Sequence, residues 1–231
     1  GAFLYSKRIF LKREIMKKPH LESTYKLLIN GEWKEASDKA TYKSYCPANG
    51  EVLAECAQAT REDVEDAITA AWAAFETWKN VPVNAEILNK VADIIDENRE
   101  HLAMVETLDN GKPIRETLNV DIPMAAQHFR YFAGCIMASE GSANILGKDT
   151  LSLILREPIG VVGQIVPWNF PFLMAAWKLA PVLAAGDCTV FKPSSTTSLT
   201  VLELAKLTQD VIPAGVFNVV TSRGSKSGPY I

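Results

Sequence analysis

Polar residues that could do chemistry follow two apolar runs, each at the point where the run ends. Val161–Val166 is apolar and rich in β-branched residues, which predicts a strand buried on both faces. Residues 167–171, Pro-Trp-Asn-Phe-Pro, break this run because proline cannot continue a central strand. The second run, Cys188–Phe191, ends at residues 192–195, Lys-Pro-Ser-Ser. Both polar segments are therefore candidates for a binding site at the ends of two strands.

Asn169 and Lys192 are the residues of these segments with the clearest chemical potential. The Asn169 amide could donate to an oxygen that becomes negative on a carbonyl substrate, and such donors contribute about 3 kcal/mol where they have been removed. The alternative is an Asn that only satisfies the backbone of a turn. Lys192 could donate to ribose hydroxyls or to a phosphate, or it is merely an exposed lysine at a strand end.

A third apolar run, Val216–Val220, leads into a segment of small residues between Gly224 and Gly228. Glycines after a strand let the backbone approach a phosphate, and the amides of a following helix favour an anion. The spacing matches neither common phosphate-binding motif, so a plain turn is the alternative.

These runs belong to a repeated strand–helix pattern. Phe172–Ala185 has the length and composition of a helix, although it contains Pro181, and the turn Gly186-Asp187 follows it. A second helix is expected over Thr197–Val211. Strand, loop, helix and strand make a βαβ unit, and such sheets bind ligands at the carboxyl ends of their strands. The segment is therefore expected to form an α/β sheet with its binding site at that edge.

The preceding part of the chain predicts a small antiparallel lead-in and a layer of helices. Asn30-Gly31 is a strong hairpin signal, and Thr60 with Asp63 resembles a capping box. The apolar face of the helix after Thr60 is expected to include Trp72 in the core. The expected strands are Lys26–Ile29, Glu32-Trp33, Tyr42–Tyr45, Val52–Cys56 and Leu151–Leu155, and the other expected helices are Pro82–Leu108 and one from about Pro113, interrupted at Pro123. The overall class is α/β with an N-terminal helical layer.

Composition narrows the function further. The 231 residues are 48% hydrophobic and 22% charged with a net charge of −3, which is ordinary for a globular protein and gives no reason to expect nucleic acid. Every long apolar run is interrupted before about 20 residues, so no membrane-spanning helix is expected. The four cysteines form no C-x-x-C pair, so we expect no metal site, small buried thiols and a reducing cytoplasm. The acids around Asp93 and Glu100, together with His101, are expected on a solvated helix face.

Residues 1–18 differ from the rest of the chain. They contain six Lys or Arg and one Glu, whereas the remainder is acidic. We interpret them as an atypical basic N-terminal extension, with Met16 as a plausible native start.

The chain resembles the aldehyde dehydrogenase superfamily from about Lys26 onward. The segments that carry this resemblance are LLINGEW, CPANGEVLAECAQATREDVEDAITAAWAAFETW, DNGKP (109–113), HFRYFAG (128–134), REPIGVVGQIVPWNFP, PVLAAGDCTVFKPS and IPAGVFNVV. The resemblance implies a Rossmann-like cofactor-binding fold and NAD(P)-dependent oxidation of an aldehyde to an acid. In that family a cysteine thiolate attacks the aldehyde, a hydride passes to the nicotinamide, and a glutamate-activated water hydrolyses the thioester.

Site roles follow from the resemblance, residue by residue. Asn169 matches the family residue that helps to hold the oxyanion, Lys192 the one that contacts the adenosine ribose, and Gly224 and Gly228 match positions near the pyrophosphate. Phe170, Met174 and Trp177 form the expected near wall of the substrate tunnel. The implied cofactor-binding set is Ile165, Val166, Pro167, Trp168, Lys192, Ser194, Ser195, Gly224 and Gly228.

Three departures from the family pattern matter. Many members have Glu at the position of Ser195, and because that Glu disfavours NADP, its absence makes use of either NAD or NADP plausible. Members usually have Gly at the position of Ser222, so the loop is altered if that position needs a positive φ. The sequence also ends before the family's general-base glutamate and catalytic cysteine.

The lack of these two catalytic residues determines the domain organisation that we expect. Residues 19–231 are expected to be the N-terminal cofactor-binding portion, without the catalytic domain and inactive alone. The stretch 151–156 matches a family oligomerisation strand, which implies a homodimer or homotetramer of the full-length form. The alternatives are a non-catalytic nucleotide-binding or oligomerising fragment and a nonfunctional frameshift product.

Overall fold

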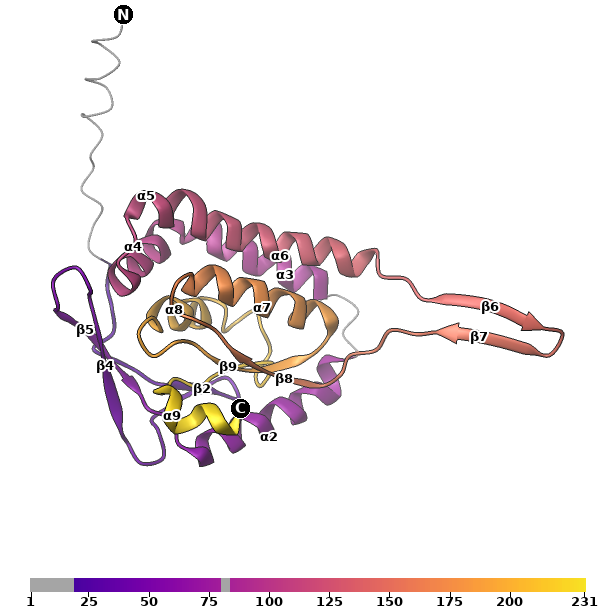
Figure 1. Cartoon of the computed structure of the whole chain (residues 1–231), viewed down its shortest axis with the longest axis horizontal. Coiled ribbons are helices and arrows are strands. Elements are labelled where there is room, and N and C mark those ends of the chain that lie inside the picture. Colours follow the sequence, from indigo (N-terminus) through magenta and orange to yellow (C-terminus); the bar gives the residue numbers. More distant parts are fainter. Residues whose placement is uncertain (1–18, 80–83) are drawn as a thin grey trace, which may run out of the picture.

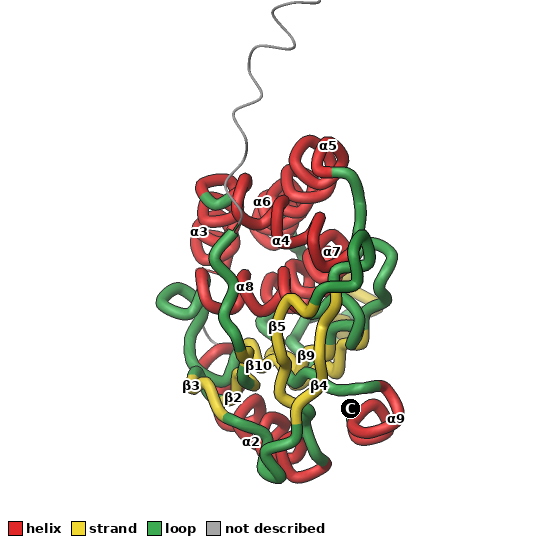
Figure 2. The backbone as a smooth tube through the Cα atoms, turned by 90° about the vertical axis from the view of Figure 1, so that its left-hand side faces the viewer, coloured by secondary structure: helices red, strands yellow, loops and turns green. Residues whose placement is uncertain are grey.

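A five-stranded sheet forms the centre of the computed structural model, which describes residues 19–79 and 84–231. Its strand order is β3-β2-β10-β9-β8. Helix α2 lies on one side of the sheet, and α7 and α8 lie on the other, where α3, α4 and α6 cover them as an outer layer (Figures 1 and 2). The strands are β1 Thr24–Tyr25, β2 Leu27–Ile29, β3 Glu32–Lys34, β4 Thr41–Tyr45, β5 Val52–Ala57, β6 Ser142–Gly147, β7 Thr150–Ile154, β8 Val161–Ile165, β9 Cys188–Lys192 and β10 Phe217–Val219.

The rest of the regular secondary structure in the described chain is helical. They are α2 Arg61–Trp78, α3 Asn84–Glu97, α4 Arg99–Asn110, α5 Ile114–Glu116, the π-helical turn η1 Thr117–Asp121, α6 Ile122–Met137, α7 Pro171–Ala185, α8 Leu199–Leu207, α9 Gly224–Ser227 and the 3₁₀ turn η2 Gly228–Tyr230. None of the helices in the described ranges is both long and apolar enough to cross a bilayer.

The predicted βαβ unit is confirmed. Strands β8, β9 and β10 are parallel, and α7 connects the first two. The register pairs Ile165 with Lys192 and Phe191 with Val219, so the three strands end at one edge of the sheet. The Asn30-Gly31 turn and the capping box at Thr60 are confirmed as well.

The antiparallel lead-in is divided between two sheets. The β2–β3 hairpin joins the main sheet, because β2 pairs antiparallel with β10. Strands β4 and β5 instead form a separate sheet with β1, which runs parallel to β5. Strand β6 was not predicted, and it pairs with β7 in an exposed hairpin.

Strand β8 is not buried on both faces, as its composition predicted. Only Gln164 of this strand is buried, and Ile165 is 56% exposed. The reason is its place at the edge of the sheet, with β9 as its one neighbour in the described structure. The prediction that Trp72 lies in the core was also wrong, because its side chain is 49% exposed.

The predicted long helices are interrupted at other positions than expected. The predicted helix 82–108 is broken at Asn98 into α3 and α4, and its first residues, 82 and 83, lie outside the described residues. The helix after Pro113 changes to a π-helical turn before Pro123. Pro123 is the second residue of α6 and directly follows this turn, so the chain is helical on both sides of the proline, and its missing N–H interrupts the helical hydrogen bonds there. The predictions for residues 1–18 also lie outside the described residues.

Candidate functional site

The two predicted polar segments lie side by side. Beyond the last paired residues, the Val166 N–H donates to the Lys192 carbonyl at 3.2 Å. On the other side of β9, the Val220 N–H donates to the Phe191 carbonyl at 2.9 Å. The strand ends therefore bring the residues after β8, β9 and β10 to a common edge.

The segment after β8 is open to solvent. Trp168 is 63% exposed, and Pro167 and Asn169 are exposed too. Val166 is the exception, because its side chain is buried in the core. Together with exposed Ile165, this loop presents an apolar surface with one side-chain amide in its middle.

Lys192 is not the exposed strand-end lysine that was the alternative prediction. The residue is 4% exposed, and burial lowers the pKa of its ammonium group. Its Nζ donates to the Pro193 carbonyl at 3.2 Å, and it forms no ion pair with a carboxylate of the described residues. An ammonium group has three donors, so Lys192 retains capacity to bind an oxygen-rich ligand.

The two serines beyond Lys192 are half-buried. The Ser194 hydroxyl lies 2.9 Å from that of Thr196, and the Ser194 carbonyl accepts from the Ser198 hydroxyl at 2.8 Å. These bonds shape the short connection between β9 and α8. No acid stands within this connection, since its residues 193–198 are Pro, Ser and Thr.

The Gly224–Gly228 segment is helical and not the predicted loop. Gly224 begins α9 and Gly228 begins η2, and neither has a positive φ. A methyl group built on either would meet no atom within 4 Å, so the space beside both is open. Ser222 does not have a positive φ either, and its buried hydroxyl donates to the Arg223 carbonyl at 2.7 Å. A serine is therefore compatible with this backbone.

The C-terminal part of α4 holds the segment after β8 in place. The Asn110 Nδ2 donates to the Trp168 carbonyl at 2.7 Å. The Lys112 Nζ stands 3.5 Å from the centre of the Phe170 ring and forms an ion pair with Asp121. Sequence reasoning took Asn110-Gly111 only as a helix cap, which Gly111 confirms, and as part of the family resemblance; it assigned no role to Lys112.

Two buried carboxylates of α4 bind the first turns of two other helices. Glu106 accepts the Phe172 N–H at 3.2 Å, in the first turn of α7. Asp109 accepts the Leu199 N–H of α8 at 2.8 Å and the Ser44 hydroxyl at 2.6 Å. Negative groups satisfy free amides at helix N-termini and interact favourably with the helix dipole. A sequence signal was present: both acids stand four residues after an inward apolar residue, Leu102 and Val105.

Burial dominates the electrostatics of these acids. It raises the pKa of Glu106 to about 7, although the Thr200 hydroxyl and the Phe172 N–H oppose the shift. It likewise raises the pKa of Asp109 to about 7, against the hydrogen bonds from Ser44 and Leu199. Both groups therefore titrate in the folded chain near neutral pH.

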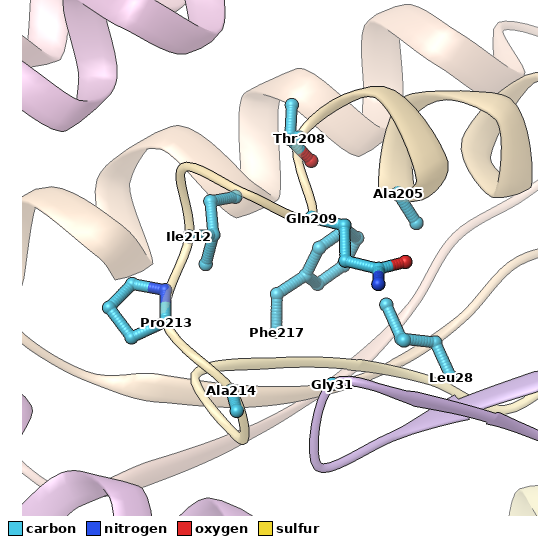
Figure 3. Close-up of a pocket in the computed structure, with 9 residues that line it drawn as sticks. All are labelled: Leu28, Gly31, Ala205, Thr208, Gln209, Ile212, Pro213, Ala214 and Phe217. Carbon is cyan, nitrogen blue, oxygen red and sulfur yellow. The ribbon is translucent and has the colours of Figure 1, made fainter.

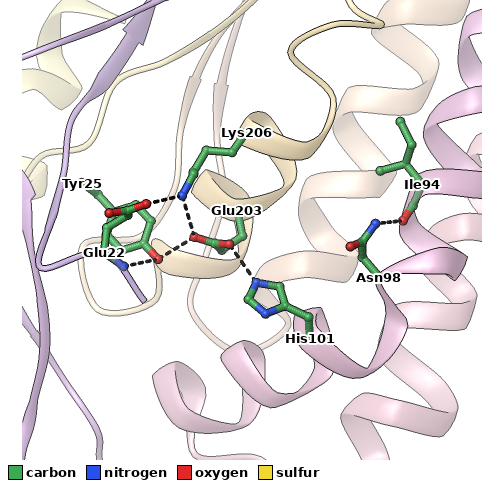
Figure 4. A network of polar contacts seen from close by, with 7 residues as sticks. All are labelled: Glu22, Tyr25, Ile94, Asn98, His101, Glu203 and Lys206. Carbon is green, nitrogen blue, oxygen red and sulfur yellow. Dashed lines mark hydrogen bonds and ion pairs between the residues drawn. The ribbon is translucent and has the colours of Figure 1, made fainter. Parts of the chain in front are cut away.

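A polar network joins α4 to α8 at a second place (Figure 4). The His101 Nε2 lies 2.8 Å from Glu203 Oε2, and the Tyr25 hydroxyl donates to Glu203 Oε1 at 2.6 Å. His101 is thus not on the predicted solvated face. That prediction is confirmed for the exposed Asp93 and Asp96, both of which bind Arg130.

Two hollows lie outside the strand edge. One lies between the β2–β3 turn and the end of α8 (Figure 3), and its volume of about 10 Å³ is close to that of one water position. The other, of about 460 Å³, lies on α6 and α7 and includes Trp177 and His128. Trp177 is one of the three residues of the expected substrate wall.

None of the four cysteines is part of either loop. Cys46, Cys56 and Cys188 are buried, as predicted, whereas Cys135 on α6 is exposed. Burial raises the pKa of Cys56 and of Cys188 to about 12, which opposes thiolate formation.

Residues 33–231 match the model of the aldehyde dehydrogenase family. The chain is 50% identical over 202 residues to an acetaldehyde dehydrogenase of Pseudomonas aeruginosa, covering 87% of this chain and 40% of that protein. It is 46% identical over 213 residues to a long-chain-aldehyde dehydrogenase of Acinetobacter, covering 91% and 42%. The chain thus spans about two fifths of the length of these relatives.

Solved structures are similar over the same part. The NAD⁺ complex of an aldehyde dehydrogenase from Bacillus cereus has a TM-score of 0.89 at 38% identity, covering 93% of this chain and 46% of that one. The structure of a Burkholderia cenocepacia protein described as an aldehyde dehydrogenase has a TM-score of 0.88 at 40% identity, covering 90% and 43%.

The raised pKa of Asp109 predicts a defined pH dependence of stability. Its ordinary value is 3.8 and its folded value about 7, so between these limits the folded chain holds a proton that the unfolded chain has lost. Stability therefore falls as pH rises through this window, by on the order of 1 kcal/mol per pH unit. Urea unfolding between pH 5 and 7 should show that Asp109→Asn lacks this part of the slope, whereas Asp93→Asn, at an exposed acid, retains it. An equal slope in wild type and Asp109→Asn would contradict the assignment.

Proposed function

Because the chain belongs to the aldehyde dehydrogenase family, we propose that it binds NAD or NADP as part of an enzyme that oxidises aldehydes to carboxylic acids. The observation that best supports this proposal is the position of Lys192. Its ammonium group is buried at the sheet edge without a carboxylate partner, and the residue pairs in register with exposed Ile165. The NAD⁺ complex of the Bacillus cereus relative supports the same cofactor class.

The residues at the edge fit a dinucleotide. Lys192 would donate to the ribose hydroxyls, with Ser194 and Ser195 beside it, and the open space at Gly224 and Gly228 would admit the pyrophosphate. No acidic side chain in residues 193–198 would repel a 2′-phosphate, which supports NADP as well as NAD. Ile165 and the loop from Val166 to Trp168 would form the wall of the cleft.

Asn169 is the proposed catalytic residue of this chain. When bound, the nicotinamide ring accepts a hydride from the substrate carbon. The Asn169 amide, exposed on the loop after β8, would donate to the substrate oxygen while that oxygen carries negative charge. Phe170, Met174 and Trp177 would form the near wall for the aldehyde.

None of the four cysteines of this chain is proposed as the nucleophile. Cys56 and Cys188 are buried thiols with raised pKa values, and no cysteine is on either loop. The lack of a cysteine on either loop favours a second candidate function, a nucleotide-binding or oligomerising unit without turnover. We accordingly propose that the 231-residue chain alone does not oxidise aldehydes. The four cysteines are all free, which supports a cytoplasmic location.

Calorimetry with NAD and NADP tests the cofactor site. Replacing Lys192 by Met keeps an apolar stem of similar length but removes the charged donors, and one hydrogen bond to a charged group contributes about 1.5–3 kcal/mol. We expect Lys192→Met to weaken binding at least about tenfold. Lys178→Met, at an exposed lysine of α7, should leave the affinity unchanged. Absence of heat from the wild-type chain with either nucleotide would overturn the proposed function.

The β6–β7 hairpin is the proposed contact with a second copy. It extends away from the body of the molecule (Figure 1). One face carries Ile145, Leu151 and Leu153, which are 83%, 60% and 58% exposed; Ile145 is paired with Leu151, and Leu153 lies two residues further along the same strand as Leu151. Large exposed apolar patches mark interaction surfaces, and two such hairpins could bury each other.

Sedimentation velocity tests this contact. The wild-type chain should self-associate as a dimer or tetramer, and Leu151→Asp with Leu153→Asp should give a monomer because the contact would bury two charges. Asn144→Asp, at a neighbouring strand position, should remain associated. A wild-type chain that is monomeric at all concentrations, or a double variant that still associates, would refute the proposal.

A further inference from the structure

The side chains that reach the residues on both sides of Asn169 come from one short segment, 110–112. Asn110 donates from Nδ2 to the carbonyl of Trp168 at 2.7 Å. Lys112 stands over the ring of Phe170, 3.5 Å from its centre. Asn169 itself makes no hydrogen bond among those found in the described chain, so its place depends on its two neighbours.

The Asn110 side chain is not needed to end its own helix. Gly111, with φ of 87°, provides the left-handed C-cap of α4, and its N–H donates to the Thr107 carbonyl at 3.0 Å. The Asn110 amide is thereby available for a backbone carbonyl 58 residues away. Capping of α4 therefore does not explain the orientation of the Asn110 side chain.

Lys112 is fixed from two directions. Its side chain is 19% exposed and forms an ion pair with Asp121, which is 1% exposed. The ammonium group is therefore held in place by the carboxylate on one side and lies on the Phe170 ring on the other. A cation over an aromatic face is attracted more strongly when it is desolvated. The contact holds the residue that directly follows Asn169.

The segment that carries these side chains is itself anchored. Glu106 and Asp109 fix α4 to the first turns of α7 and α8. A methyl group on Gly111 would stand 2.7 Å from Pro47 Cγ, so the turn after α4 is packed closely against the β4–β5 connection. Asn110 and Lys112 thus extend from a rigid support.

We propose that Asn110 and Lys112 are positioning residues that hold the loop 167–171 so that the Asn169 amide keeps one orientation. Their role rests on the proposed function of Asn169 as the donor to the substrate oxygen. Neither residue is proposed to touch substrate or cofactor. An oxyanion donor must be in place before the reaction to be effective, which is the property that such support provides.

Backbone relaxation of the ¹⁵N-labelled chain tests the proposal without nucleotide or turnover. In the wild type we expect the Asn169 N–H to have an order parameter of about 0.85, as in rigid backbone. In Asn110→Ala it should fall below about 0.6. Asn110→Asp keeps the shape of the side chain but lacks the donor, so it should behave like Asn110→Ala. Lys112→Met combined with Asp121→Asn, which leaves no unpaired buried carboxylate, should also lower the value.

Asn98→Ala is the matched control. Asn98 makes the same kind of bond, from Nδ2 to the Ile94 carbonyl at 2.9 Å, at the other end of α4 (Figure 4). It should lose similar stability in urea unfolding but leave the Asn169 order parameter unchanged. An Asn169 that is equally ordered in wild type and Asn110→Ala, or equally loosened by Asn98→Ala, would overturn the positioning role. Because the experiment needs no nucleotide, its failure is distinct from an absence of NAD binding in calorimetry.

Discussion

The arrangement of the candidate site depends on two buried carboxylates of one helix. Glu106 and Asp109 of α4 bind the first turns of α7 and α8. The two acids are three residues apart, which corresponds to about 4.5 Å along the axis of α4. The N-termini of the two crossover helices are therefore held at a separation that a regular helix defines. A cap of this kind contributes about 0.5–2 kcal/mol.

Burying these two carboxyl groups is energetically unfavourable for their charged forms. Burial raises the pKa of both carboxyl groups to about 7, so the charged forms that would cap best are disfavoured around neutral pH. Hydrogen bonds from the two helix amides and from the Ser44 hydroxyl offset part of this penalty. These bonds also fix the geometry of the site, because the loop 167–170 directly precedes α7 and the segment after Lys192 precedes α8. Fixing both helices fixes both loops.

Local sequence patterns predicted those helices and strands whose own residues mark where they begin and end. The strands β8, β9 and β10 and the helix α7 follow from apolar runs ended by proline and glycine. The edge position of β8 could not be predicted, because it depends on which strands pair with it. The break at Asn98 and the π-helical turn before Pro123 depend likewise on packing between distant elements.

Long-range hydrogen bonds explain why the supporting residues were missed. Glu106 and Asp109 bind backbone amides 66 and 90 residues further along the chain, and Asn110 binds a carbonyl 58 residues away. Acids on a helix rich in charge are usually solvated, and the only local sign of burial was their spacing of four residues from Leu102 and Val105. Lys192 was singled out from its place after a strand, but its burial required the packed structure. The helical form of residues 224–228 was missed because small residues suggested a loop.

The central claim is that a dinucleotide binds across the carboxyl ends of β8 and β9. Titration of the ¹⁵N-labelled chain with NAD, followed by amide chemical shifts, tests it most directly. The account predicts that the largest shifts occur at Val166, Lys192 and Gly224, at the common edge of the sheet. Largest shifts around Ala205 and Ala214, at the hollow beside the β2–β3 turn, or no shifts at saturating NAD, would contradict it.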